Sequence, residues 1–214
     1  MLRKTGRRGL HPAAYPALTA AALVVAVLCV CAGSVDISPR DTFLSIWNTV
    51  FGIPVADENL RAIVVFVRLP RVLAVGLVGA GLSLCGAAMQ GLLINPLADG
   101  STLGVSSGAS LGAVLAIALG VTLPDFPLGG TTVFAMVFAF LSLLLILFIA
   151  FRIDRSLSTN TIILVGVVFS MFASSAISLI VTAVGEKAKT ITFWTMGSLA
   201  GRDYADVLAL LLAL

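Results

Sequence analysis

Between Arg68 and Ile117 the chain reads RLPRVLAVGLVGAGLSLCGAAMQGLLINPLADGSTLGVSSGASLGAVLAI. The short segment Asn95–Gly100 in this stretch separates two long uncharged runs, Val72–Ile94 and Thr102–Leu123. About 20 helical residues cross the roughly 30 Å hydrocarbon core of a bilayer. Each run is therefore long enough to span a membrane as one helix.

The segment between the two runs, NPLADG, predicts a tight turn. Pro96 cannot continue the preceding helix, and either Asp99 or Ser101 is expected to cap the helix that follows. The composition of the turn predicts no further role.

The composition of the whole chain agrees with a membrane protein. Of its 214 residues 59% are hydrophobic and 11% are charged, and the mean hydropathy is +1.13. Soluble domains have about 45–50% apolar and about 25% charged residues. The net charge of +3 does not indicate nucleic-acid binding, because no basic stripe with interleaved aromatic residues occurs. The sequence predicts an all-α, polytopic membrane helix bundle.

Five uncharged windows are long enough to span the bilayer, and a sixth apolar run begins near Tyr204. Because the eight residues Val207–Leu214 cannot cross a membrane, we expect residues 1–214 to form one truncated transmembrane domain. It would hold five complete helices and the start of a sixth, and the natural protein would continue further. The expected spans are Ala14–Val35, Val72–Ile94, Thr102–Leu123, Thr131–Phe151 and Thr161–Val184.

A short amphipathic segment, Asp41–Ile53, separates the first two spans. Its apolar residues recur at helical spacing, which predicts an interfacial helix that begins at Asp41 as N-cap and ends at Gly52. Basic residues over all flanks do not decide the orientation of the chain, but the N-terminal cluster favours a cytoplasmic N-terminus. That cluster consists of Arg3, Lys4, Arg7 and Arg8.

Several chemistries are excluded by the sequence. No GxxxxGK pattern followed by Ser or Thr occurs, so ATP hydrolysis would need another subunit. The string GVSSG, Gly104–Gly108, matches a nucleophile elbow, but the one histidine, His11, precedes the first span. No charged residue lies in the middle of an expected span, which argues against a mechanism driven by intramembrane charges. We predict no catalytic residue, no cofactor and no metal site.

Two residue patterns concern the spans themselves. Small residues recur every fourth position from Gly104 through Gly108 and Gly112, which predicts close helix packing. The fifth expected span carries hydroxyl residues at the same spacing. These hydroxyls either line an aqueous path or bond to their own helix, and Gln90 in the second span either contacts substrate or bonds between helices. The hydroxyl stripe comprises Ser170, Ser174, Ser178 and Thr182.

The motif RLPR stands before the second span. Pro70 fits the first turn of a helix because it needs no N–H partner there. Arg68 and Arg71 either anchor the helix at the headgroups or form a charged latch, since guanidinium groups bind carboxylates through forked hydrogen bonds.

Taken together, Arg68–Ile117 resembles the FecCD-type permease family in both the order and the spacing of its residues. The resemblance extends over Thr161–Leu214, where ILVGVVFSMFASSAISL and FWTMGSLAGRDYADVL are similar to that family's fifth helix and the approach to its sixth. One departure is Gly100, where the family commonly has proline.

The resemblance implies a ten-helix permease subunit of an ATP-binding-cassette importer for iron-siderophore, haem or cobalamin-type substrates, with an iron complex as the leading expectation. Such a subunit lies in the bacterial plasma membrane as a homo- or heterodimer around a central pathway. Its partners are two cytoplasmic ATPase subunits and an extracytoplasmic substrate-binding protein. The ATPase-coupling segment would follow the sixth helix, so the 214-residue chain alone is not expected to transport.

The same resemblance implies roles for individual residues. Arg68 and Arg71 would face outward and receive glutamates of the binding protein. The hydroxyl stripe would border the pathway, and the cytoplasmic gate loop would contain Arg152, Arg155 and Asn160. Without the resemblance, the alternatives are a self-contained membrane scaffold or a passive pore built on the glycine pattern, or an intramembrane enzyme that lacks a nucleophile–base pair.

Overall fold

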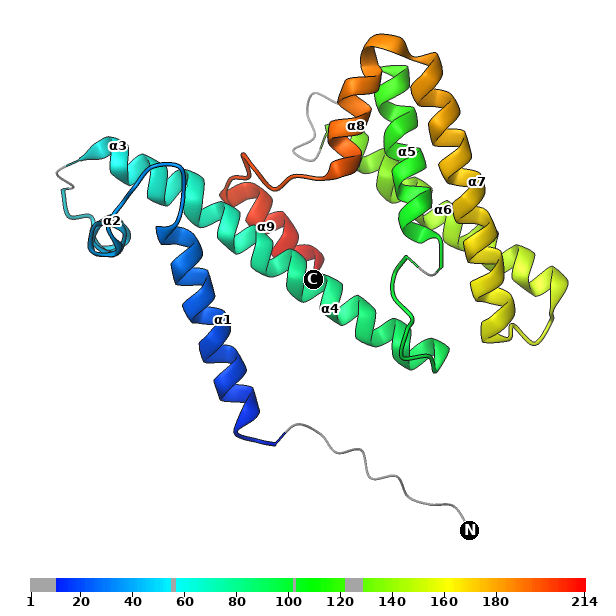
Figure 1. Ribbon diagram of the computed structural model, residues 1–214, viewed down its shortest axis with the longest axis horizontal. Helices are drawn as coiled ribbons and strands as arrows, with labels where there is room; N and C mark the ends of the chain where they lie inside the picture. The colour runs from blue at the N-terminus through cyan, green and yellow to red at the C-terminus, as the bar shows by residue number, and fades with distance from the viewer. Residues whose placement is uncertain (1–10, 55–56, 102, 122–128) are drawn as a thin grey trace. The chain divides into compact units, whose positions relative to one another are not determined.

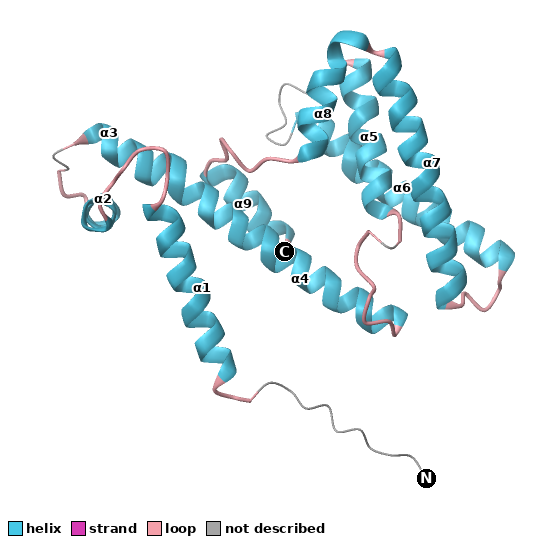
Figure 2. Cartoon of the chain, in the orientation of Figure 1, coloured by secondary structure: helices cyan, strands magenta, loops and turns pink. Residues whose placement is uncertain are grey.

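The computed structural model describes residues 11–54, 57–101, 103–121 and 129–214. Within these ranges every regular element is a helix (Figure 2), as the sequence predicted. Thr102, Leu123 and the N-terminal basic cluster lie outside the described residues. The helices labelled in Figure 1 are α1 (Ala14–Cys31), α2 (Pro39–Phe51), α3 (Glu58–Arg61), α4 (Leu69–Leu93), α5 (Val105–Leu119), α6 (Gly129–Ile153), α7 (Thr159–Ala183), α8 (Ala188–Met196) and α9 (Tyr204–Ala213).

Four helical runs in the described residues are long and apolar enough to cross a membrane: α1, the run Glu58–Leu93, α6 and α7. The third expected span is shorter than predicted. Its helix, α5, has 15 residues and rises about 22 Å. It ends at Gly120, whose φ of 71° is left-handed and suits a residue without a Cβ. The count of five complete spans therefore does not follow from the helices described.

The second span begins earlier than predicted. Helix α3 continues through a π-helical segment, Ala62–Arg68, directly into α4. Pro70 consequently lies inside a long helix and not in its first turn. A proline in a helix interior lacks one N–H and its ring crowds the carbonyl four residues back, and the wider π turn immediately before Pro70 accommodates both defects.

Two helix starts also differ from the prediction. Ser38, not Asp41, is the N-cap of α2, and its hydroxyl oxygen accepts from the backbone N–H of Asp41 at 3.1 Å. The predicted stop at Gly52 is confirmed by its left-handed φ of 66°. Neither Asp99 nor Ser101 is the N-cap of α5, because the helix begins later than predicted, at Val105, with Gly104 as its N-cap.

The sequence analysis did not predict α8. It follows α7 after a single 3-10 turn, Gly185–Lys187. Its nine residues are too few for a span, so a search for long uncharged windows passes over them.

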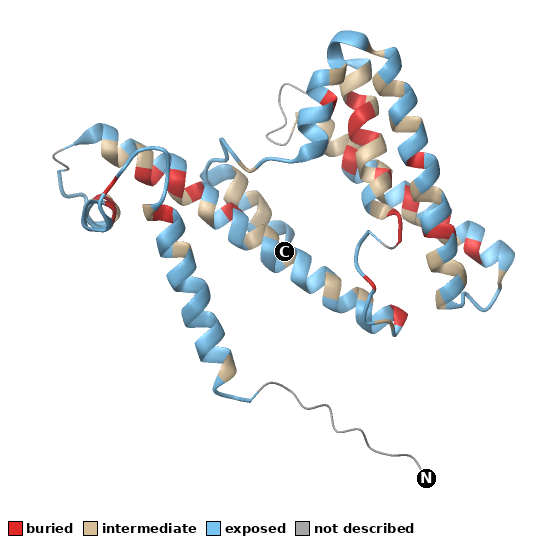
Figure 3. Cartoon of the chain, in the orientation of Figure 1, coloured by how far each residue is buried: buried red, intermediate tan, exposed pale blue. Residues whose placement is uncertain are grey.

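The described chain divides into two compact units, with the boundary between Leu77 and Val78 inside α4. The first unit contains the residues up to Leu77 together with Ala200–Ala213. Its core consists of Val30, Ile37 and Val64. Most side chains of α1 are exposed (Figure 3), and they are apolar, which is the surface that a bilayer would cover.

The second unit extends from Val78 to Leu199. Here α5 packs against both α6 and α7, and buried residues form a stripe along α5 (Figure 3). One core cluster joins Leu93, Ala98 and Leu103, and another joins Ile146, Ala150 and Val165.

The glycine pattern lies in tight contacts between α5 and the helices beside it. A Cβ added at Gly108 would stand 2.4 Å from the Cβ of Ser142, and one at Gly112 would stand 2.5 Å from the Cβ of Phe138. At Gly104 it would stand 2.9 Å from the carbonyl oxygen of Gly166. Such separations leave no space for a side chain, so glycine sets the distance between α5 and its neighbours.

We expect Gly108→Ala to lower the free energy of unfolding by about 1–3 kcal/mol, because the added methyl group overfills the α5–α6 contact. Gly86→Ala in α4 is the matched control, since no described atom lies within 4 Å of a Cβ there. Thermal unfolding of the protein in nanodiscs measures both. Equal midpoints for the two variants would contradict the proposed tight contact.

Candidate functional site

The two arginines of RLPR have different environments. Arg68 is 9% exposed, and its guanidinium donates to three backbone carbonyls. Nη1 donates to Val30 at 3.1 Å and to Cys31 at 2.7 Å, and Nη2 donates to Val35. The last carbonyls of a helix have no partner within that helix. Arg68 supplies hydrogen bonds to those at the end of α1 and to one in the loop that follows.

Gly33 makes this arrangement possible. A Cβ at Gly33 would stand 2.5 Å from Nη2 and 2.6 Å from Cζ of Arg68. The guanidinium is fixed by its three carbonyl partners, so it could not move aside for a side chain. The loop after α1 therefore needs glycine at this position.

Arg71 lies one helical turn beyond Arg68 and is exposed. Among the described residues it forms no ion pair. A partner carboxylate could reach Arg71 directly, whereas it would have to displace carbonyl bonds to reach Arg68. Arg68 thus holds the end of α1 and the loop after it, while Arg71 is the more accessible arginine of the pair.

A tyrosine from the end of the chain completes this region. The Tyr204 hydroxyl donates to the carbonyl of Val65 at 2.6 Å. Val65 belongs to the π segment and is 6% exposed. The two residues are 139 positions apart, and no spacing in the sequence indicated their contact.

The hydroxyl stripe of α7 bonds largely to its own helix. Ser170 donates to Gly166 at 2.9 Å, and Ser178 donates to Ser174 at 3.0 Å. Thr182 donates to Ser178 at 2.9 Å. The protons of these hydroxyl groups form hydrogen bonds within the helix, but the hydroxyl oxygens can still accept further hydrogen bonds. Ser174, Ser178 and Thr182 are exposed within the unit. The stripe offers a row of acceptors. Gln90, on α4, is also exposed.

The predicted gate residues surround the turn between α6 and α7. Arg152 lies over the ring of Phe148 at 5.1 Å, while Arg155 and Asn160 are exposed. Asp154 organises the turn. Its Oδ1 accepts from the N–H and the hydroxyl of Ser156 at 2.9 and 2.7 Å, and its Oδ2 accepts from the N–H of Ser158 at 3.2 Å. These bonds, the Ser156 hydroxyl first, hold the pKa of Asp154 well below its usual range.

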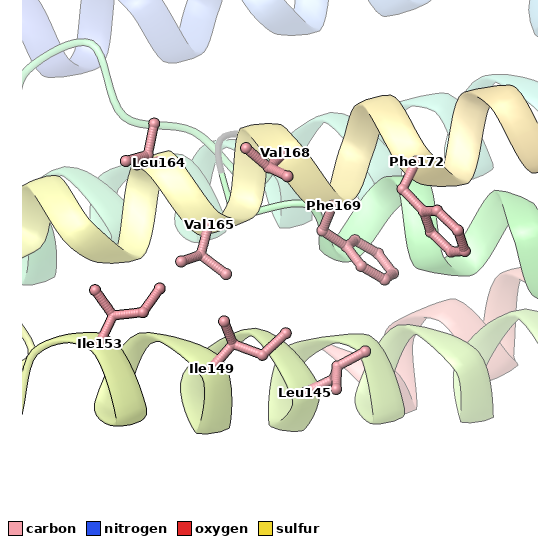
Figure 4. A pocket seen from close by; sticks show the side chains of 8 residues that line it. All are labelled: Leu145, Ile149, Ile153, Leu164, Val165, Val168, Phe169 and Phe172. Carbon is pink, nitrogen blue, oxygen red and sulfur yellow. The ribbon is translucent and has the colours of Figure 1, made fainter.

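An apolar cavity of about 450 Å³ lies between α6 and α7. Val165, Phe169 and Phe172 point from α7 toward α6, whereas Leu164 at the margin points away from it (Figure 4). None of the lining side chains carries a donor or acceptor, so a polar substrate would find no hydrogen bond there. The lining residues are Leu145, Ile149, Ile153, Leu164, Val165, Val168, Phe169 and Phe172.

A lysine that the sequence analysis did not single out closes the end of α5. The Nζ of Lys187 donates to the carbonyl of Ala118 at 2.8 Å. This carbonyl belongs to the last turn of α5 and has no partner within the helix. A cation at a helix C-terminus also interacts favourably with the helix dipole.

The fold and these sites together define a polytopic helical membrane protein with one anchored and one exposed arginine and a polar face on one helix. A profile of the FecCD transport family matches residues 21–214. The chain belongs to the FecCD transport family.

Three relatives are similar to most of this chain. YvrB of Bacillus subtilis (strain 168), an uncharacterized ABC transporter permease protein, is 39% identical over 90% of this chain and 54% of its own length. The molybdate import system permease protein MolB of Haemophilus influenzae is 31% identical over 93% and 59%. The vitamin B12 import system permease protein BtuC of Escherichia coli is 36% identical over 85% and 51%.

One solved structure has the same fold. It is described as an inward-facing conformation of a metal-chelate type ABC transporter. It superimposes with a TM-score of 0.73 at 30% identity, covering 92% of this chain and 57% of the other. The chain thus spans somewhat more than half the length of these three relatives and of the solved structure.

We expect Arg68→Lys to lower the free energy of unfolding by about 1–3 kcal/mol, because a single ammonium group cannot reach three carbonyls in the forked geometry of arginine. Hydrogen exchange in the loop 32–38 should accelerate in this variant. Arg71→Lys is the matched control and should leave both quantities unchanged. The same loss in both variants would show that Arg68 has no special structural role.

We expect Ser156→Ala to raise the pKa of Asp154 toward its ordinary value near 3.8, because it removes the largest contribution to the lowering. The lowered pKa means that the charged form stabilises the folded turn. This stabilisation is complete above about pH 4 and is lost as the pH falls through the lowered value. Carboxyl carbon chemical shifts in an NMR titration measure the change, and Ser83→Ala, on α4, is the control. An unchanged titration in Ser156→Ala would contradict the assignment.

Proposed function

We propose that this chain forms part of the membrane permease subunit of an ATP-binding-cassette importer. The observation that carries the proposal is the contrast between Arg68 and Arg71 on one helix of a FecCD family member. Arg68 is held by three carbonyls, and Arg71, one turn away, is exposed with no ion-pair partner among the described residues. Because Arg68 ties this part of the helix to the end of α1, the backbone that carries Arg71 is fixed before a carboxylate arrives, which lowers the entropy cost of binding.

In this proposal, Arg71 receives an acidic residue of an extracytoplasmic substrate-binding protein. The docked substrate then passes along the stripe that contains Ser170, Ser174, Ser178 and Thr182, with Gln90 as a further polar contact. Acceptor oxygens along an apolar wall suit a large, partly polar solute, because they solvate it weakly and let it move on. The turn with Arg152, Arg155 and Asn160 forms the cytoplasmic gate.

For the substrate we propose an iron-siderophore complex, with haem and cobalamin as alternatives. The solved relative described as a metal-chelate type transporter and the relative named for vitamin B12 import both support a bulky metal chelate. MolB, named for molybdate import, makes an oxyanion the competing outcome. Uptake of labelled ferric siderophore, cobalamin and molybdate by the same cells would separate these substrates.

The energy source in this proposal is a pair of cytoplasmic ATPase subunits, and a second permease subunit, identical or related, completes the pathway. The subunit would lie in the bacterial plasma membrane with its N-terminus in the cytoplasm. Membership of a transport family favours this proposal over a self-contained scaffold or pore.

We expect Arg71→Glu in the full-length protein to weaken docking of the binding protein at least about tenfold, because the substitution replaces an attraction by a like-charge repulsion. Arg71→Lys should retain most of the affinity, since it keeps the charge. A Glu→Arg change on the binding protein should restore docking to Arg71→Glu. Affinities measured by surface plasmon resonance on nanodiscs test this, and undiminished docking of Arg71→Glu would overturn the assignment.

A further inference from the structure

The carbonyl of Val65 cannot be satisfied by the helix that contains it. The π segment uses hydrogen bonds that reach five residues back, as in the bond from the N–H of Leu69 to the carbonyl of Val64. In this pattern the next donor would be the N–H of residue 70, and it would bond to the carbonyl of Val65. Residue 70 is Pro70, which has no N–H.

Solvent has little access to this carbonyl. Pro70 is fully buried and Val65 is 6% exposed. A buried carbonyl without a partner costs about 1–3 kcal/mol, and more in a membrane, where no solvent donor is present. The Tyr204 hydroxyl, 2.6 Å from this oxygen, supplies the bond that Pro70 omits.

The register of the π segment determines where the arginines point. An α-helix turns by about 100° per residue, so the loss of one π turn would rotate the residues before it relative to those after it by roughly that angle. Arg68, at the end of the segment, would then lose its alignment with the carbonyls of α1. Arg71, one turn later, would present its side chain in another direction.

We propose that Tyr204 is a positioning residue for Arg71. By donating to Val65, it holds the π segment in the register that keeps Arg68 on its three carbonyls and leaves Arg71 exposed toward a docking partner. The assignment of Arg71 rests on the proposed function, but the effect of Tyr204 on the π segment does not.

The experiment uses the full-length protein in nanodiscs and four variants. Tyr204→Phe removes only the hydroxyl group, and Tyr15→Phe is the matched control because Tyr15 is exposed on α1. Pro70→Ala restores an N–H at residue 70 that can donate to Val65, so it should make the hydroxyl of Tyr204 dispensable. The fourth variant combines Pro70→Ala with Tyr204→Phe. Hydrogen exchange over residues 62–69 and affinity for the binding protein are measured for each.

We expect Tyr204→Phe to accelerate exchange in the π segment and to weaken docking, each by about five- to tenfold, the size of one lost hydrogen bond. Tyr15→Phe should change neither. The double variant should match Pro70→Ala alone, which a merely general loss of stability would not produce.

Two results would overturn the proposal: normal exchange in Tyr204→Phe, or the full loss from Tyr204→Phe persisting in the Pro70→Ala background. Failure of the unsubstituted protein to dock any binding protein would instead count against the proposed function. In that case the exchange measurements would still decide whether Tyr204 holds the π segment.

Discussion

A backbone carbonyl in hydrocarbon has no water to bond. Several carbonyls of this protein also have no donor within their own helix, and much of the structure follows from the side chains that donate to them. Those at the end of α1 bond to the guanidinium of Arg68, the one opposite Pro70 bonds to Tyr204, and one at the end of α5 bonds to Lys187. In each case a side chain distant in sequence replaces a donor that the helix itself cannot provide. Three polar residues near the ends of the spans therefore hydrogen-bond to the backbone, whereas Arg71 forms no ion pair within the part of the chain that the structure describes.

The second unit is held together differently. Apolar side chains gain little from leaving lipid for one another, so the helices associate through close backbone approach. Gly108 and Gly112 permit that approach on α5, and the side chains of Ser142 and Phe138 on α6 occupy the space that a Cβ would need. The hydroxyl stripe of α7 lies outside these contacts, and most of its residues are exposed within the unit.

The helical class and the approximate positions of the spans could be read from the uncharged windows, because hydropathy and length are local properties. The spacing of Gly104, Gly108 and Gly112 also indicated a packing face before any neighbour was known. The early start of the second span at Glu58 could not be predicted, since charged residues and Pro70 normally end a helix. The π segment lies directly before Pro70 in this continuous helix, and the Tyr204 hydroxyl donates to the carbonyl of Val65 within it. The burial of Arg68 could not be predicted either. Its partners are backbone carbonyl oxygens, which every residue has, so the sequence does not indicate which of them accept.

The shortness of α5 has a consequence for how the protein responds to its membrane. A lipid-facing helix that is too short for the bilayer must thin it or recruit neighbours, and its energy then varies with lipid composition. Much of α5 is instead buried: Gly108, Gly112, Ala113, Val114 and Ala116 are covered, and its last turn is closed by Lys187. Protein atoms, not acyl chains, form most of its surroundings. Hydrophobic mismatch should therefore act on α1, α6 and α7, whose flanks face outward, while α5 keeps its length and position in thick and thin bilayers alike.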